Sequence, residues 1–241
     1  MKKLISETLI ETAYREQPIV KLENLAKRYP DSNKGLRDIN LEVNRGEVVI
    51  ITGSSGSGKS TMLRIMQGID VADEGEVTVF GHDFKRLKPR QRQKVVRDHI
   101  GITFQDPNLD KSFSVADNII LPANASNLAV DNLTLAEAAV TFGLGDALTR
   151  DASTLSGGQK MGVSLLRALV RGHKLILSDE PTAALDTLNK VAVFDAINHC
   201  VRQLGATAVI VSHDVERARA IANREIILHD GELVDTIVYE R

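Results

Sequence analysis

Residues 53–61, which read GSSGSGKST, have the composition of a loop that binds phosphate. Glycines allow backbone conformations closed to other residues, and successive backbone N–H groups at a helix start form an anion site. The stretch follows the apolar run VVIIT, precedes a helical pattern and satisfies the spacing G-x-x-x-x-G-K-[ST]. We expect Lys59 to contact the β- and γ-phosphates of a nucleoside triphosphate and Ser60 to bind Mg²⁺. The residues assigned to this nucleotide site are Gly53, Ser54, Ser55, Gly56, Ser57, Gly58, Lys59, Ser60 and Thr61.

An acidic pair ends a second apolar stretch, in LILSDEP. Asp179 is expected to help bind Mg²⁺, as an aspartate at this place does in phosphate-loop enzymes. Glu180 could accept a proton from an attacking water molecule. The alternative is a solvated acidic pair that opens a turn before Pro181.

A second loop with small residues begins another helical pattern, in LSGGQ. Free backbone amides at a helix start again predict a phosphate site, at Ser156, Gly157, Gly158 and Gln159. One nucleotide does not need two complete phosphate cradles. We therefore expect this second loop to close over the nucleotide of another subunit.

The order of these motifs resembles that of the ATP-binding cassette family, the ATPase subunits of ABC transporters, over roughly residues 19–235. The resemblance implies that Tyr29 stacks on adenine and that Asp186, in AALD, lies at the nucleotide. It implies that Gln105, in ITFQD, reaches both Mg²⁺ and water. It also implies that His213, in IVSHD, donates a hydrogen bond to the γ-phosphate. Glu180, His213 and Gln105 are thus the expected catalytic residues, with Ser60, Gln105 and Asp179 at the metal.

Some of these assignments have alternatives within the sequence. Tyr29 could be an ordinary strand aromatic, with Lys27 or Arg28 serving in its place, and His213 could be a surface histidine. The sequence also departs from the family, because an arginine usual near position 162 is missing. Gly162 stands there instead, and a glycine inside a helix costs roughly 1 kcal/mol relative to alanine.

Alternating strand-like and helix-like segments predict an α/β fold with a P-loop core of mainly parallel strands. Short alternating segments before the phosphate loop predict an N-terminal antiparallel β subdomain. Leucine and alanine at helical spacing predict an α-helical subdomain over approximately residues 106–172. We assign residues 1–18 to an N-terminal extension and 19–241 to the ATPase domain, and expect the last strands, REIILHD and ELVDTIVY, to continue the parallel pattern.

Composition excludes several classes of protein. The chain of 241 residues has a formal net charge of −2, whereas nucleic-acid binders usually show a basic excess, so no nucleic acid is expected. The single cysteine, Cys200, excludes an internal disulfide and suggests a reducing compartment. No stretch approaches the roughly 18 apolar residues of a helix that spans a membrane. Charged residues interrupt the apolar residues near the N-terminus, which argues against a signal peptide.

These features predict an ATPase subunit in the cytoplasm, held at the inner face of the membrane by an ABC transporter transmembrane subunit. It should form a homodimer on binding ATP and Mg²⁺. The phrase SVADNIILP is similar to the subgroup that includes macrolide exporters and lipoprotein-releasing ATPases, which favours export or extraction from the membrane. The alternatives are a soluble ABC ATPase of DNA repair or the ribosome, and a regulatory nucleotide switch.

The run KRLKPRQRQKVVR, residues 85–97, contains seven lysines and arginines and no acidic residue. It could be a solvated face, or it could attract an anionic membrane surface or an acidic segment of a partner. It lacks interleaved aromatic residues, which makes single-stranded nucleic acid the less favoured partner.

Overall fold

The apolar run before the phosphate loop forms an inner strand of a 6-stranded sheet with the order β10-β9-β3-β8-β7-β6. The computed structural model describes residues 17–30, 32–104, 107–124, 132–183 and 185–240. All pairs in this sheet except β9–β10 are parallel, which confirms the α/β class. The strands are β3 (Val48–Gly53), β6 (Ile100–Thr103), β7 (Leu175–Asp179), β8 (Thr207–Val211), β9 (Arg224–His229) and β10 (Glu232–Val238).

Side chains on both faces of this sheet are buried, which explains why its inner strands are continuous apolar runs. In β3, Val49 and Ile51 pack in one hydrophobic cluster and Val48 and Ile50 in another, because successive side chains of a strand point to opposite faces. Helix α2 contributes to the first cluster and α6, α7 and α8 to the second. These helices are α2 (Lys59–Met66), α6 (Gly157–Val170), α7 (Thr187–Arg202) and α8 (Val215–Ile221).

The predicted N-terminal antiparallel sheet is present, with the order β2-β1-β4-β5. Its residues Leu22 and Leu41 are paired between β1 and β2, and Val20 and Val79 between β1 and β4. All four are buried in the cluster that contains α2, so this sheet packs against the helix that follows the phosphate loop. Its strands are β1 (Val20–Tyr29), β2 (Ser32–Val43), β4 (Glu74–Val79) and β5 (His82–Asp83).

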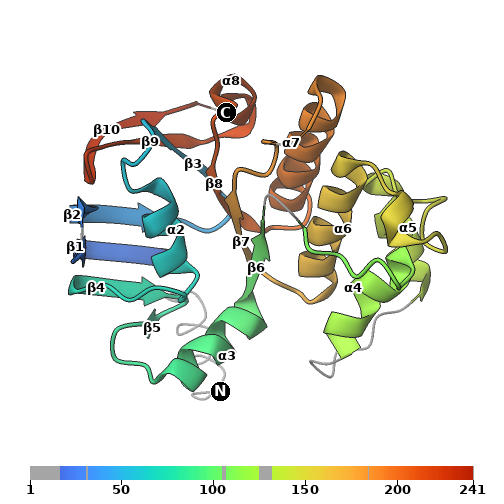
Figure 1. Ribbon diagram of the computed structural model, residues 1–241, viewed down its shortest axis with the longest axis horizontal. Coiled ribbons are helices and arrows are strands. Elements are labelled where there is room, and N and C mark those ends of the chain that lie inside the picture. The colour runs from blue at the N-terminus through green and yellow to red at the C-terminus, as the bar shows by residue number, and fades with distance from the viewer. Residues whose placement is uncertain (1–16, 31, 105–106, 125–131, 184, 241) are drawn as a thin grey trace, which may run out of the picture.

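Helices occupy the described chain between β6 and β7, on the side of the central sheet away from the antiparallel sheet (Figure 1). They include α4 (Val115–Asn124), α5 (Asn132–Thr141), the short 3-10 helix η1 (Ala152–Thr154) and α6, and α3 (Pro89–His99) precedes β6. The boundaries 106–172 for a helical subdomain and 1–18 for an extension stay predictions. Residues 1–16 lie outside the described part of the chain.

The expectation that the last strand is parallel is wrong, because β10 pairs with β9 in the antiparallel direction. Only Asp230 and Gly231 join these strands, with φ of +46° and +82°. A parallel connection needs a crossover of about a dozen residues or more, whereas a two-residue Asp-Gly turn is typical of a hairpin. Among the helices that the structure describes, none combines the length and apolar character needed to cross a bilayer.

His173 is a buried histidine at the junction of α6 and β7, with only 5% of its surface exposed. Its Nε2–H donates to the carbonyl oxygen of Arg97 at 2.9 Å. Burial lowers the pKa of His173 to about 4 from its usual 6.5, although this hydrogen bond opposes the shift. The neutral ring therefore stabilises the fold fully above pH 6.5, and this contribution is lost as the pH falls towards 4.

We expect the free energy of unfolding to fall by up to about 3 kcal/mol through this group across that pH window. His173→Gln, which can still donate to the Arg97 carbonyl, should be less stable at neutral pH but show a flatter pH dependence. Urea unfolding at several pH values measures both effects, with His82→Gln, at an exposed histidine, as the control. Equal pH dependence in wild type and His173→Gln would contradict the assignment.

Candidate functional site

The phosphate loop, residues 54–58, connects the end of β3 to the start of α2. Gly53 and Gly58 have φ of +139° and +102°, which residues with a side chain rarely adopt. A Cβ at Gly53 would lie 2.0 Å from the carbonyl oxygen of Leu228, so β9 packs directly against the loop backbone. The tip of the loop, residues 54–56, is exposed and accessible to a ligand.

Lys59, the first residue of α2, holds its ammonium group over this loop. Its Nζ donates hydrogen bonds of 2.9 Å to the carbonyl oxygens of Gly53 and Ser54, and only 7% of the residue is exposed. Neither acceptor carries a charge, and no carboxylate among the described residues forms an ion pair with Lys59. A partly desolvated cation beside backbone amides at a helix start is suited to bind phosphate.

The hairpin turn between β9 and β10 contacts the phosphate loop through the backbone. The backbone N–H of Gly231 donates to the carbonyl oxygen of Ser57 at 3.1 Å. A Cβ at Gly231 would lie 2.4 Å from the carbonyl oxygen of Gly35, so the turn also fits closely against β2. The Asp-Gly turn is visible in the sequence, but its contact with a loop so distant in the chain is not.

Ser60 and Asp179 meet at the other end of the loop, although 119 residues separate them. The Ser60 hydroxyl donates to Asp179 Oδ1 at 3.4 Å. Asp179 ends β7, two strands away from β3 in the sheet, and parallel strands bring their carboxyl ends to one edge. A hydroxyl and a carboxylate oxygen are donors that Mg²⁺ prefers, so this pair fits the ion.

Glu180 and His213 also meet, at the carboxyl ends of β7 and β8. Glu180 Oε2 accepts a hydrogen bond of 3.0 Å from the backbone N–H of His213, and Oε1 lies 3.4 Å from His213 Nε2. The backbone of Glu180 has φ of +49°, and its N–H donates to the carbonyl oxygen of Val211 at 2.9 Å. Glu180 Oε1 is buried and accepts no hydrogen bond in the described structure, and the contact with His213 Nε2 is its ion pair.

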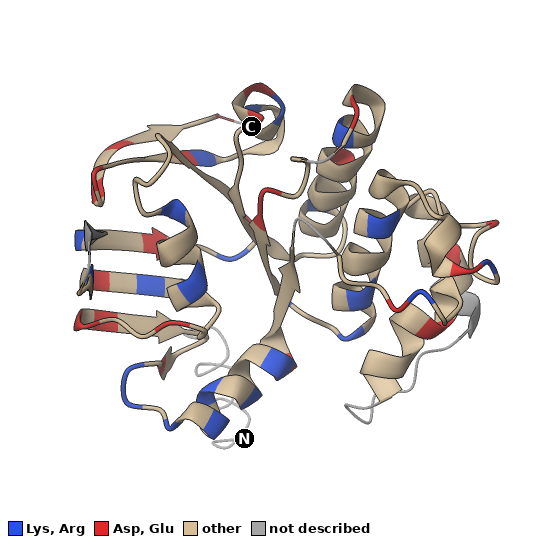
Figure 2. Cartoon of the chain, in the orientation of Figure 1, with Lys and Arg blue, Asp and Glu red and all other residues tan. Residues whose placement is uncertain are grey.

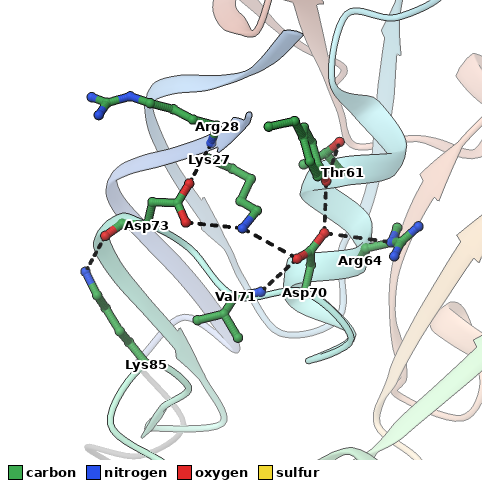
Figure 3. Close-up of polar contacts among 9 residues, drawn as sticks. Lys27, Arg28, Thr61, Arg64, Asp70, Val71, Asp73 and Lys85 are labelled. Carbon is green, nitrogen blue, oxygen red and sulfur yellow. Dashed lines mark hydrogen bonds and ion pairs between the residues drawn. The ribbon is translucent and has the colours of Figure 1, made fainter. Parts of the chain in front are cut away.

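The side chain of Tyr29 is fixed by its hydroxyl rather than free to turn. The hydroxyl donates to Asp70 Oδ2 at 2.9 Å and lies 3.5 Å from the hydroxyl of Thr61. Figure 3 shows Asp70 as the centre of this group, with Lys27 and Arg64 on either side. Asp70 is a partner that the sequence pattern did not reveal, since no motif marks it.

The two alternatives to Tyr29 are already engaged in ion pairs. Lys27 Nζ lies 3.2 Å from Asp73 and 3.7 Å from Asp70, and Arg28 lies 2.7 Å from Glu74. Stacking of adenine on Tyr29 stays a prediction. Gln105 lies outside the described residues, so its predicted roles at the metal and in catalysis stay predictions too.

The LSGGQ motif begins α6, as predicted. Ser156 caps the helix: its hydroxyl accepts from the N–H of Gln159 at 3.2 Å, and the Gln159 side chain accepts from the N–H of Ser156 at 3.1 Å. Ser156, Gly158 and Gln159 line a cavity of about 700 Å³ beside α5 and α7.

A separate cavity of about 800 Å³ is lined by Ser60, Asp179 and Glu180. Gly157 is the residue of the LSGGQ motif that reaches this second cavity. Ser156, Gly158 and Gln159 therefore line a different cavity from that of the metal-site residues of the same chain.

Asp186 caps the N-terminus of α7. Its Oδ1 accepts from the N–H groups of Leu188 and Asn189 at 3.1 and 3.0 Å, and the Asn189 side chain donates to its Oδ2 at 2.6 Å. Hydrogen bonds from Asn189 lower the pKa of Asp186. A Cβ at Gly158 would lie 2.4 Å from Asn189 Oδ1, so Asn189 connects the Asp186 turn to the LSGGQ motif. No motif in the sequence predicted this contact.

Gly162 has a packing reason in α6. A Cβ there would lie 3.1 Å from the carbonyl oxygen of Phe142 and 3.6 Å from Leu144 Cδ1. The glycine thus lets α6 approach the segment that follows α5. The departure from the family pattern therefore lies where α6 packs against this segment.

The family pattern described as ABC transporter matches residues 36–183. The chain is 35% identical to the methionine import ATP-binding protein MetN of Rhizobium johnstonii, over 98% of this chain and 66% of that protein. It is 40% identical to the macrolide export ATP-binding/permease protein MacB of Burkholderia cenocepacia, over 90% of this chain and 32% of that protein. The dimeric post-hydrolysis structure of the ATP-binding cassette MJ0796, bound to ADP and Pi, superposes with a TM-score of 0.77 at 33% identity, over 91% of this chain and 98% of that one.

This chain therefore spans 66% of the import protein's length and 32% of the export protein's length. An import protein and an export protein match it with similar identity, which shows that the similarity lies in the shared cassette. The similarity to a macrolide export protein agrees with the resemblance drawn from the sequence. Export as the direction of transport stays a prediction.

Proposed function

The chain belongs to the ABC transporter family, and from this premise we propose that it is the subunit that binds and hydrolyses ATP to drive a separate membrane subunit. Two copies would close around two Mg-ATP molecules at the cytoplasmic face of the membrane. The observation that carries the proposal is the convergence of Lys59, Ser60, Asp179, Glu180 and His213 at the carboxyl ends of the parallel strands of one sheet.

These residues have complementary roles in phosphoryl transfer to water. Lys59 and the loop amides bind the β- and γ-phosphates. Ser60 and Asp179 hold Mg²⁺, which when bound neutralises charge on the phosphate oxygens. Glu180 accepts the proton of the attacking water at Oε1, which accepts no hydrogen bond among the described residues, and His213 donates to the γ-phosphate. The hydrogen bond from the His213 N–H keeps the Glu180 carboxylate in place.

Dimerisation is supported by the arrangement of the LSGGQ motif and by the dimeric cassette of known structure. Ser156, Gly158 and Gln159 do not line the cavity of Ser60, Asp179 and Glu180. This separation supports the proposal that they act on a nucleotide bound by a second copy. Tyr29, Gln105 and Asp186 would complete the site as the family resemblance implies.

A regulatory nucleotide switch without hydrolysis is the alternative that the site argues against. Such a switch needs the phosphate loop but neither a general base nor a group that orients it. Here Glu180 and His213 are both present and in contact. A soluble ABC ATPase without a membrane partner shares all of these residues, so the partner rather than the site distinguishes it.

Lys59→Ala tests the nucleotide site. We expect loss of tight ATP binding, of about 10² in affinity or more, because the variant removes the cation held over the loop. Equilibrium binding of labelled ATP measures it, with Lys94→Ala, an exposed lysine on α3, as the control. Affinity within a few-fold of wild type would remove Lys59 from its proposed place.

A further inference from the structure

Asp70 lies in the turn that follows α2, the helix that begins at the phosphate loop. The backbone N–H groups of Ile69 and Asp70 both donate to the carbonyl oxygen of Arg64, at 3.0 and 3.2 Å, so the turn folds back on the end of the helix. The backbone N–H of Val71 donates to Asp70 Oδ1 at 3.2 Å. The position of the Asp70 carboxylate is therefore fixed by α2.

The Asp70 carboxylate binds side chains from two elements. Its Oδ2 accepts the hydrogen bond of 2.9 Å from the hydroxyl of Tyr29, the last residue of β1, and lies 4.0 Å from Arg64 Nε on α2. Its Oδ1 lies 3.7 Å from Lys27 Nζ, and 19% of the side chain is exposed. Figure 3 shows both cations directed at this carboxylate. Since hydrogen bonds to an ionised acceptor are stronger than those between neutral groups, Asp70 is suited to hold the tyrosine.

The ring of Tyr29 has two further contacts. Its hydroxyl lies 3.5 Å from that of Thr61, which is in the first turn of α2, two residues after Lys59. Lys27 Nζ lies 5.7 Å from the ring centroid, over one face of the ring. A cation at this distance is attracted to the face of an aromatic ring. A base that stacks on Tyr29 would therefore use the face away from Lys27.

A second carboxylate, that of Asp73, binds the same end of β1 without contacting the tyrosine. Asp73 Oδ1 accepts from Lys27 Nζ at 3.2 Å, and Oδ2 accepts from the backbone N–H of Arg28 at 2.7 Å. Figure 2 shows basic residues on β1 and α2 and acidic residues on β4, which begins directly after Asp73. Of the two carboxylates that bind Lys27, only Asp70 contacts Tyr29 among the described residues.

We propose that Asp70 is a positioning residue for the nucleobase, which fixes the ring of Tyr29 in one orientation before the nucleotide binds. This inference rests on the proposed function, in which Tyr29 stacks on adenine. A tyrosine that is already ordered loses little side-chain freedom when the base stacks on it, and this preorganisation favours binding. The contact with Thr61 places the same ring at the helix of the phosphate loop, so base and phosphates are bound by connected parts of the fold.

Equilibrium binding of ATP and of inorganic tripolyphosphate, which has no base, to the full chain tests the inference. Mg²⁺ is left out, so that neither ligand is hydrolysed. Asp70→Ala should bind ATP about fivefold more weakly, because part of the stacking energy is lost, but should bind tripolyphosphate within about twofold of wild type. Asp70→Asn, whose amide oxygen can still accept from the hydroxyl, should restore most of the ATP affinity.

The hydroxyl contact itself is tested by Tyr29→Phe, which keeps the ring. It should weaken ATP binding by the same factor as Asp70→Ala, and the double variant should be no weaker than either single variant, since both remove one interaction. Asp73→Ala is the matched control, because it removes the other carboxylate that binds Lys27, and it should change ATP affinity less than about twofold. Tyr29→Phe leaves the ion pairs of Asp70 in place, so it remains decisive if Asp70→Ala does not fold.

Four results would overturn the inference. They are unchanged ATP affinity in Tyr29→Phe, losses that add in the double variant, an equal loss in Asp73→Ala, and equal losses of ATP and tripolyphosphate affinity in a folded Asp70→Ala. Hydrolysis of Mg-ATP by the wild-type chain is measured in parallel. Its absence rejects the proposed function, whereas intact hydrolysis with any of the four results rejects the role of Asp70 alone.

Discussion

Glu180→Gln is expected to slow ATP hydrolysis by about 10² or more while leaving ATP binding intact, the usual scale for the loss of a general base. Glutamine has the same shape, and its carbonyl oxygen can still accept the hydrogen bond that the His213 N–H gives to Oε2. The φ of +49° at this position disfavours glutamate and glutamine alike, so the local backbone should not change. What is lost is the ability to take a proton from water.

The same variant should accumulate as a dimer in Mg-ATP. In the proposed function nucleotide closes the two copies and hydrolysis reopens them, so a chain that binds but does not hydrolyse should remain closed. Light scattering measures the mass, and phosphate release measures the rate. Glu76→Gln, at an exposed glutamate on β4, serves as the control and should hydrolyse and dimerise as wild type does. Normal phosphate release by Glu180→Gln would show that Glu180 is not the general base.

Local patterns predicted the parts of the site that depend on short segments of chain. The phosphate loop needs glycines at fixed spacing next to a strand and a helix, and Gly53 and Gly58 adopt the positive φ that this spacing suggests. Asp179 and Glu180 end an apolar strand, and parallel strands bring such ends to one edge. The meeting of Ser60 with Asp179 therefore followed from the motif and the α/β class together.

Contacts between distant segments could not be predicted in this way. The hydroxyl of Tyr29 binds Asp70, and Asn189 lies against Gly158, but neither partner belongs to a motif. The direction of β10 depended on a two-residue turn, whose length matters more than the strand pattern that follows it. These features follow from how elements pack, which a periodic pattern does not encode.

The same reasoning applies to the basic run 85–97. The run has seven positive residues within thirteen, and four of them lie on α3, but the sequence does not show what lies opposite that helix. The structure places α6 there, with Arg167 and Arg171, 75 and 74 residues after Arg92 and Arg97 respectively. Charge density at a cavity is a property of two elements, so only the folded chain shows which of these residues line a cavity.

A variant of the LSGGQ motif and a variant of the phosphate loop are expected to restore ATPase activity when they are paired in one dimer. Ser156→Arg places a bulky cation where the motif would contact phosphate, and Lys59→Ala removes the loop cation. Loss of the Ser156 cap costs about 1 kcal/mol, which the fold can tolerate. Each variant homodimer has two composite sites with one damaged half apiece, and should be nearly inactive.

The mixed dimer has one whole composite site. It consists of the phosphate loop of the Ser156→Arg chain and the LSGGQ motif of the Lys59→Ala chain, while the second site is damaged in both halves. A linked dimer that carries both substitutions in one copy and none in the other is the matched control. That control contains the same two changes, but each of its composite sites has one damaged half.

The two linked dimers distinguish a composite site from one that lies within a single chain. If Ser156 acts on the partner's nucleotide, the dimer with the substitutions in separate copies hydrolyses ATP and the dimer with both in one copy does not. If Ser156 acts on its own chain's nucleotide, the order of the two activities is reversed, because the unsubstituted copy is then whole. Phosphate release by the two linked dimers at equal concentration decides between them, and trapping of labelled ATP in a Glu180→Gln background shows which sites have closed. A higher rate in the dimer with both substitutions in one copy would contradict the placement of Ser156, Gly158 and Gln159 over the nucleotide of a second copy.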